Sequence, residues 1–137
     1  MKKYILLLLL VSTLSFNLKS DKNDIIGKWS GKDKNQIGSI IFDSEGYVTI
    51  ELGGEIIGGE KFKMGDKLAK MTYIYYDNKN PVEINLIMSE LDGKHIRTIY
   101  LFAEFKNKNT IKVAFLRNKN DTREFNDDNS IILNRQK

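Results

Sequence analysis

Few side chains in this chain of 137 residues can perform acid–base or nucleophilic chemistry. There is one histidine, His95, and no cysteine. Ser89, Asp92 and His95 supply the residue types of a serine-based triad, but the local sequence lacks the strained turn that presents a nucleophilic serine. His95 directly follows the turn sequence Asp92-Gly93-Lys94, so we expect a solvated histidine rather than a general base. The sequence therefore predicts that the protein is not an enzyme.

Metal-binding chemistry is also poorly represented. Without cysteine and with one histidine, the chain lacks the usual ligands of a transition-metal site. The acidic residues of Asp43-Ser44-Glu45 and Asp127-Asp128 offer oxygen ligands to calcium, but neither sequence has an EF-hand loop pattern. We therefore expect no metal and no cofactor.

The first residues have the pattern of a secretory signal peptide. Lys2 and Lys3 precede the apolar run from Tyr4 to Leu14, and small residues follow near position 20. The competing interpretation is a membrane anchor, but the run is much shorter than the roughly 20 apolar residues that a spanning helix needs. We expect residues 1–20 to be a signal peptide and residues 21–137 to be one exported domain, periplasmic or extracellular, with no membrane span.

The charge distribution of the remaining domain argues against a nucleic-acid partner. The whole chain has 22 basic and 18 acidic residues, but Lys2, Lys3 and Lys19 lie in the leader, which leaves a net charge of +1. The other lysines alternate with acidic residues instead of forming a basic stripe. Because there is no cysteine, no disulfide can stabilise the exported domain, and burial and sheet closure must do so.

Alternating apolar and polar residues predict an all-β fold. Apolar residues occupy every second position from Val82 to Met88, and Asp92-Gly93 is a type I′ turn signal that leads into the longest expected strand, from about residue 96 to 105. An open sheet of this size would leave exposed edges, so we predict a single antiparallel up-and-down β-barrel of eight or nine short strands. The glycine pairs Gly53-Gly54 and Gly58-Gly59 are expected to form bends.

The same alternation identifies side chains that point inward. The candidates to line a cavity combine tyrosines, which need a hydroxyl partner when buried, with methionines, which fit irregular spaces. The alternative is that they pack on one another as an ordinary core. Which face of the strand from residue 96 to 105 points inward is left open. The six ligand-binding candidates are Met71, Tyr73, Tyr75, Ile84, Leu86 and Met88.

The chain resembles the small secreted bacterial lipocalin-like domains, which have a calycin-type fold. The resemblance begins at Gly27-Lys28-Trp29 and continues in order through Ile40 to Gly46, Tyr76 to Leu86, Ile99-Tyr100 and Arg123-Glu124-Phe125. It implies an up-and-down barrel with Trp29 at its closed end, Gly27 at the turn into the first strand and a basic side chain, here Arg135, stacked across the indole. The chain departs from larger lipocalins, which carry a T-D-x-x-Y-type motif and cysteines.

Two functions fit these observations. The first is a secreted or periplasmic protein that binds a small hydrophobic or amphipathic ligand inside the barrel. The second is a protein-binding or inhibitor module of the cell envelope, with a barrel filled by side chains. An apolar void of roughly 300 Å³ or more favours the carrier, and a filled interior favours the module. In either case we expect a monomer.

Overall fold

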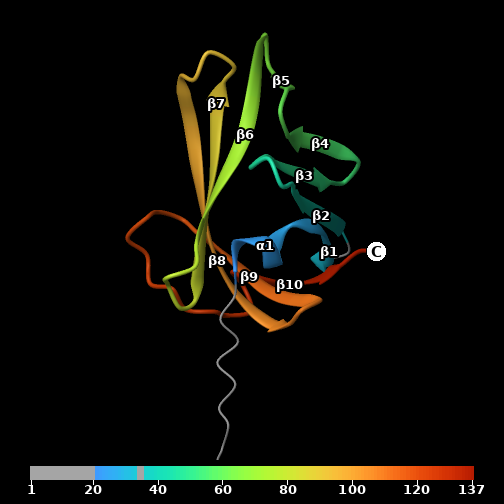
Figure 1. Cartoon of the computed structure of the whole chain (residues 1–137), viewed down its shortest axis with the longest axis vertical. Helices are drawn as coiled ribbons and strands as arrows, with labels where there is room; N and C mark the ends of the chain where they lie inside the picture. The colour runs from blue at the N-terminus through green and yellow to red at the C-terminus, as the bar shows by residue number, and fades with distance from the viewer. Residues whose placement is uncertain (1–20, 34–35) are drawn as a thin grey trace, which may run out of the picture.

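A computed structural model describes residues 21–33 and 36–137 (Figure 1). The expected signal peptide lies outside the described residues. Within them, no helix is long and apolar enough to cross a membrane. The only helix described is the single turn α1 (Lys22–Ile25), which the Asp21 side chain caps by accepting a hydrogen bond from the Asn23 N–H.

The predicted all-β antiparallel fold is confirmed. The described residues form one sheet in the order β4-β3-β2-β1-β10-β9-β8-β7-β6-β5, so every pair of neighbours is consecutive in sequence except β1 and β10. These two strands join the ends of the domain, where Trp29 pairs with Arg135. The strands are β1 (Gly27–Asp33), β2 (Gln36–Phe42), β3 (Val48–Leu52), β4 (Glu55–Gly58), β5 (Phe62–Met64), β6 (Lys67–Tyr76), β7 (Val82–Glu90), β8 (His95–Asn107), β9 (Thr110–Leu116) and β10 (Ser130–Arg135).

The strand count is ten rather than eight or nine. The additional strands are the short β4 and β5, and β4 forms where the glycine pairs predicted only bends. Gly58 has a φ of +98°, and a Cβ at this position would lie 2.4 Å from the Val48 carbonyl oxygen, so only glycine fits. The glycines therefore allow β4 to pass close to β3 instead of preventing a strand.

The sheet closes almost completely where β6 meets the residues that flank β3 and β4. The Met71 N–H of β6 donates to the Gly59 carbonyl at 2.9 Å, and the Tyr73 N–H donates to the Gly46 carbonyl at 3.0 Å. Tyr47 and Thr72 form an isolated antiparallel bridge at the same place. These backbone contacts satisfy edge groups that an open sheet would expose. In Figure 1 the long strands β6, β7 and β8 extend beyond β2 and β3.

One end of the barrel is sealed by the opening motif of the domain. Trp29 is fully buried, and its indole N–H donates to the Ile25 carbonyl at 2.8 Å. The Arg135 guanidinium carbon lies 4.2 Å from the centroid of the indole, and the same guanidinium donates to the carbonyls of Ile26 and Asp24. Arg135 thus holds α1 over the indole. Gly27 leaves room for the Arg135 guanidinium, because a Cβ at position 27 would lie 2.8 Å from it.

The strand β8 buries parts of both of its faces. Leu101 and Ala103 point into the barrel core, whereas Phe102 is fully buried on the outer face. The outer side of Phe102 is covered by Phe125, whose ring centroid lies 4.6 Å away. Phe125 belongs to the long connection between β9 and β10, so this connection, which we name the strap (residues 117–129), lies across the outer face of the sheet.

Candidate functional site

The barrel encloses an apolar cavity of about 190 Å³, which we name the inner cavity. Its wall comes from both halves of the sheet. Leu52 and Phe115 line it and are 51% and 50% exposed, so the cavity reaches solvent on their side. The lining residues are Gly38, Ser39, Ile40, Phe42, Ile50, Glu51, Leu52, Ile84, Leu101, Ile111, Val113, Phe115, Ile131 and Leu133.

This mouth lies away from the sealed end. The Lys108 carbonyl, just before β9, accepts hydrogen bonds from Arg135, whereas Phe115 lies near the far end of β9. Gly27, Trp29 and Arg135 do not line the inner cavity. The barrel is therefore closed at the Trp29 end and accessible at the other.

Of the six residues that the sequence predicted as ligand-binding, the structure places Ile84 in the wall of the inner cavity. The other five, Met71, Tyr73, Tyr75, Leu86 and Met88, are buried in the main core and do not line that wall. Period-two alternation identifies the buried face of β6 and β7. It does not identify which buried side chains border empty space, because that depends on strands β2, β3, β9 and β10.

Tyr73 illustrates the use of a tyrosine as a core residue. Its hydroxyl donates to the Asp43 carbonyl at 2.8 Å, and its ring packs edge-on against Phe42 with the centroids 4.9 Å apart. Burial raises the pKa of Tyr73, and the nearby charge of Asp43 raises it further. The hydroxyl is therefore protonated, and it connects β6 to the turn after β2.

A second hollow, of about 320 Å³, lies on the outside of the barrel, and we name it the outer groove. Register places its floor across four strands: Ile74 of β6 pairs with Asn85, Asn85 with Tyr100, and Tyr100 with Leu116 of β9. The strap forms one wall. The lining residues are Ile74, Tyr76, Lys79, Glu83, Asn85, Ile87, Thr98, Tyr100, Leu101, Leu116, Lys119 and Arg123.

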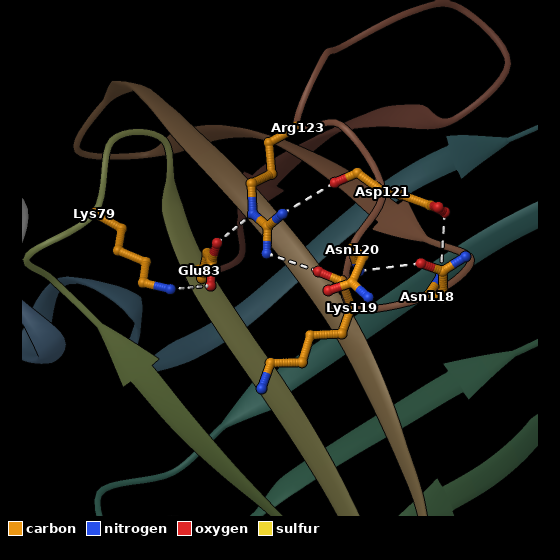
Figure 2. Close-up of polar contacts among 7 residues, drawn as sticks. All are labelled: Lys79, Glu83, Asn118, Lys119, Asn120, Asp121 and Arg123. Carbon is orange, nitrogen blue, oxygen red and sulfur yellow. Dashed lines mark hydrogen bonds and ion pairs between the residues drawn. The ribbon is translucent and has the colours of Figure 1, made fainter.

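An ion-pair cluster around the buried Glu83 borders the outer groove (Figure 2). Glu83 is 8% exposed, and its two carboxylate oxygens are held separately. The Lys79 ammonium lies 2.8 Å from one oxygen, and the Arg123 Nε–H donates to the other. Burial by itself raises the pKa of the Glu83 carboxyl, but hydrogen bonds and charge from Lys79 and Arg123 outweigh burial and hold the pKa below its usual range. Glu83 is therefore ionised and fastens the strap to β7.

The start of the strap is folded around Arg123. The guanidinium donates to the Asp121 and Lys119 carbonyls at 2.9 and 3.1 Å, and the Asp121 carboxylate accepts from the N–H groups of Arg117 and Asn118. In Figure 2 no dashed line joins the Lys119 ammonium to the other six residues drawn. Its ammonium makes no ion pair or hydrogen bond within the described part of the chain.

Sequence reasoning did not single out the groove residues. Arg123 contributed to the family resemblance, but its contact with Glu83 spans 40 positions of sequence. One available signal was Glu83 itself, a carboxylate among the apolar residues of the most regular strand. Such a residue needs a cationic partner if its face is covered.

The structure also places the residues considered for catalysis and metal binding. His95 is exposed, and its Nε2 lies 2.9 Å from the Thr98 hydroxyl. The Asp43 carboxylate accepts from the backbone N–H groups of Glu45 and Tyr47. Among residues 21–33 and 36–137, no group of three His, Cys, Asp or Glu side chains is arranged to hold a metal ion.

The chain was compared with protein-family models, curated proteins and solved structures, and none of them matches it significantly. The architecture is therefore described by its geometry: a nearly closed antiparallel up-and-down barrel, sealed at one end by Trp29 and hollow near the other.

Proposed function

We propose that this protein is an exported, lipocalin-like carrier that binds a small hydrophobic molecule, or the apolar end of an amphipathic one, in the inner cavity. The observation that supports the proposal is the apolar void behind Leu52 and Phe115 in a barrel closed at its other end. The ordered resemblance from Gly27 to Phe125 supports the same class of protein. The role is non-catalytic.

The volume of the inner cavity restricts the ligand. Drug-sized ligands occupy pockets of roughly 300–1,000 Å³, whereas an apolar cavity of roughly 150 Å³ accepts benzene. At about 190 Å³ the inner cavity is smaller than the roughly 300 Å³ that favours a carrier on the sequence-based expectation, so we restrict the proposed ligand to a single ring or the end of an acyl chain. The rest of a longer ligand would leave through the mouth, past Leu52 and Phe115.

The binding test uses a series of n-alkanols of increasing chain length, with the affinity measured by calorimetry. Each methylene that enters an apolar site contributes about 0.8 kcal/mol, or roughly fourfold in affinity. We expect affinity to rise with chain length while methylenes enter the inner cavity and then to level off. In parallel, native mass spectrometry of the protein purified from its own host should show a bound mass.

The matched variant for this test is Ile50→Phe, which adds volume to a partly buried residue of the cavity wall. We expect the variant to fold with a modest loss of stability, about 1–3 kcal/mol, and to bind the longer alkanols at least tenfold more weakly. Absence of binding to alkanols, fatty acids and isoprenoids by the wild-type protein, together with no bound mass from the host, would contradict the proposal.

A second candidate is a protein-binding or inhibitor module of the cell envelope. It is favoured by exposed apolar side chains near the β3–β4 turn, where Ile37 and Ile56 are 71% and 65% exposed. Contiguous exposed apolar side chains are typical of interaction surfaces. A pull-down from envelope extract should recover a partner that Ile37→Ser/Ile56→Ser no longer retains, and recovery of no partner would count against this function.

A further inference from the structure

The outer groove contains polar groups that the fold does not use. The Asn85 amide, the Tyr100 hydroxyl and the Lys119 ammonium all line it, and none has a hydrogen-bond partner among the described residues. We propose that the outer groove is a second binding site, separate from the inner cavity, for a small organic anion that carries an apolar ring or chain.

The charge of the groove determines the sign of the ligand. Glu83 is fully engaged by Lys79 and Arg123, and this cluster of one carboxylate and two cations keeps one positive charge in excess. Lys119 adds a second positive charge, which no acidic side chain of the described residues neutralises. An anion placed beside Lys119 gains a charge-assisted hydrogen bond without breaking a contact that the fold needs.

The floor of the groove determines the rest of the ligand. Apolar side chains from both flanks, Ile74 and Leu116, border the central pair Asn85 and Tyr100. Ile74 is 43% exposed on the outer face of β6. A ring or short chain would cover this apolar surface, and Asn85 would donate to or accept from a polar substituent. A free inorganic anion would use only the Lys119 part.

The volume and the surroundings of the groove distinguish it from the inner cavity. At about 320 Å³ it is large enough for a small aromatic acid or phosphate ester. Of the residues that line the inner cavity, the one with a charged side chain is Glu51, and Lys28 pairs with it at 3.0 Å. The two hollows therefore select different chemistries, and a ligand of one is not expected to compete for the other.

The experiment follows amide and side-chain resonances of the ¹⁵N-labelled protein while phenyl phosphate, benzoate, benzyl alcohol or inorganic phosphate is added. Phenyl phosphate and benzoate carry both required parts, benzyl alcohol lacks the charge, and inorganic phosphate lacks the ring. We expect the two aromatic anions to shift the Asn85 side-chain amide and strap resonances. The anion that binds more tightly, phenyl phosphate or benzoate, then shows whether the groove prefers a phosphate or a carboxylate. The neutral alcohol should bind the groove at least fivefold more weakly.

The variants are Lys119→Gln in the groove and, as a matched control, Lys63→Gln, an exposed lysine of β5 outside it. We expect Lys119→Gln to weaken aromatic-anion binding about fivefold or more, and Lys63→Gln to leave it unchanged. Equal effects of the two variants, equal binding of inorganic phosphate and phenyl phosphate, or no shift at Asn85 would each overturn the proposal.

Discussion

The inner cavity and the outer groove lie on opposite faces of β7, and two neighbouring residues of this strand line them, one on each face. Ile84 is 1% exposed and lines the cavity, whereas Glu83 is 8% exposed and borders the groove. Similar burial is achieved by apolar packing on one side and by ion pairing under a strap on the other. The inner face is therefore stabilised by the barrel itself, whereas the cover of the outer face depends on two contacts of the strap, Arg123 with Glu83 and Phe125 with Phe102.

The largest effect is expected from Trp29→Ala, which removes the seal of the inner side. The indole is fully buried, bonded to the Ile25 carbonyl and stacked under Arg135, so its loss leaves a large cavity and unsupported partners. We expect the free energy of unfolding to fall by about 3–5 kcal/mol in urea denaturation. Trp29→Phe, which keeps a ring at this position, should lose less. An unchanged unfolding midpoint for Trp29→Ala would show that the closed end does not need the indole.

The next effect concerns the outer side, where Arg123→Gln leaves Glu83 without its strap partner. A buried carboxylate that loses a charged donor is destabilising, and we expect a loss of about 2 kcal/mol in the same assay. Lys79→Gln is the matched variant, because the Lys79 side chain is 47% exposed against 31% for Arg123. It should cost less than about 1 kcal/mol. Equal losses in the two variants would mean that the strap is not fastened mainly through Arg123.

The ion-pair cluster also predicts how stability depends on pH. The pKa of the Glu83 carboxyl is lower in the folded protein than in the unfolded chain. Its contribution to stability is therefore fully present above the unfolded pKa of roughly 4.3, and it is lost as the pH falls through the lower folded pKa. We expect Glu83→Gln to be about 1 kcal/mol less stable than wild type at pH 7. The difference in free energy of unfolding between wild type and Glu83→Gln should shrink as the pH falls below about 4. A difference that stays constant with pH would contradict this prediction.

The two sides also differ in how far the sequence predicted them. Alternation from Val82 to Met88 was enough to place the buried face of β7, because period-two patterning is a local property of a strand. On β9 the same alternation directs Phe115 inward, and it lines the inner cavity while remaining 50% exposed near the mouth. The extent of the void was not predictable, since it depends on how side chains from distant strands fail to meet.

The outer side depends on contacts that no local pattern reports. On β8, Leu101 and Phe102 are adjacent and both buried, so alternation left the inward face undecided. The structure resolves this because Phe125 of the strap covers Phe102. Strap residues have no periodicity, and their position follows from the pairing of Arg123 with Glu83. Similarly, the glycine pairs predict bends because a residue without a side chain permits a bulge, whereas in the structure Gly58 belongs to β4 and is required by the close contact with β3.

The smallest effect on stability is expected from Lys119→Gln. Lys119 holds Arg123 through its backbone carbonyl, whereas its ammonium bonds to nothing in the described chain. Removing the charge should therefore change the free energy of unfolding by no more than about 0.5 kcal/mol. A loss comparable to that of Arg123→Gln would instead show that Lys119 is part of the strap attachment. If stability is unchanged, weaker binding of phenyl phosphate by the same variant has to arise at the outer groove. The outer side of the barrel would then contain a side chain that the fold does not require, unlike the packed side chains of the inner side.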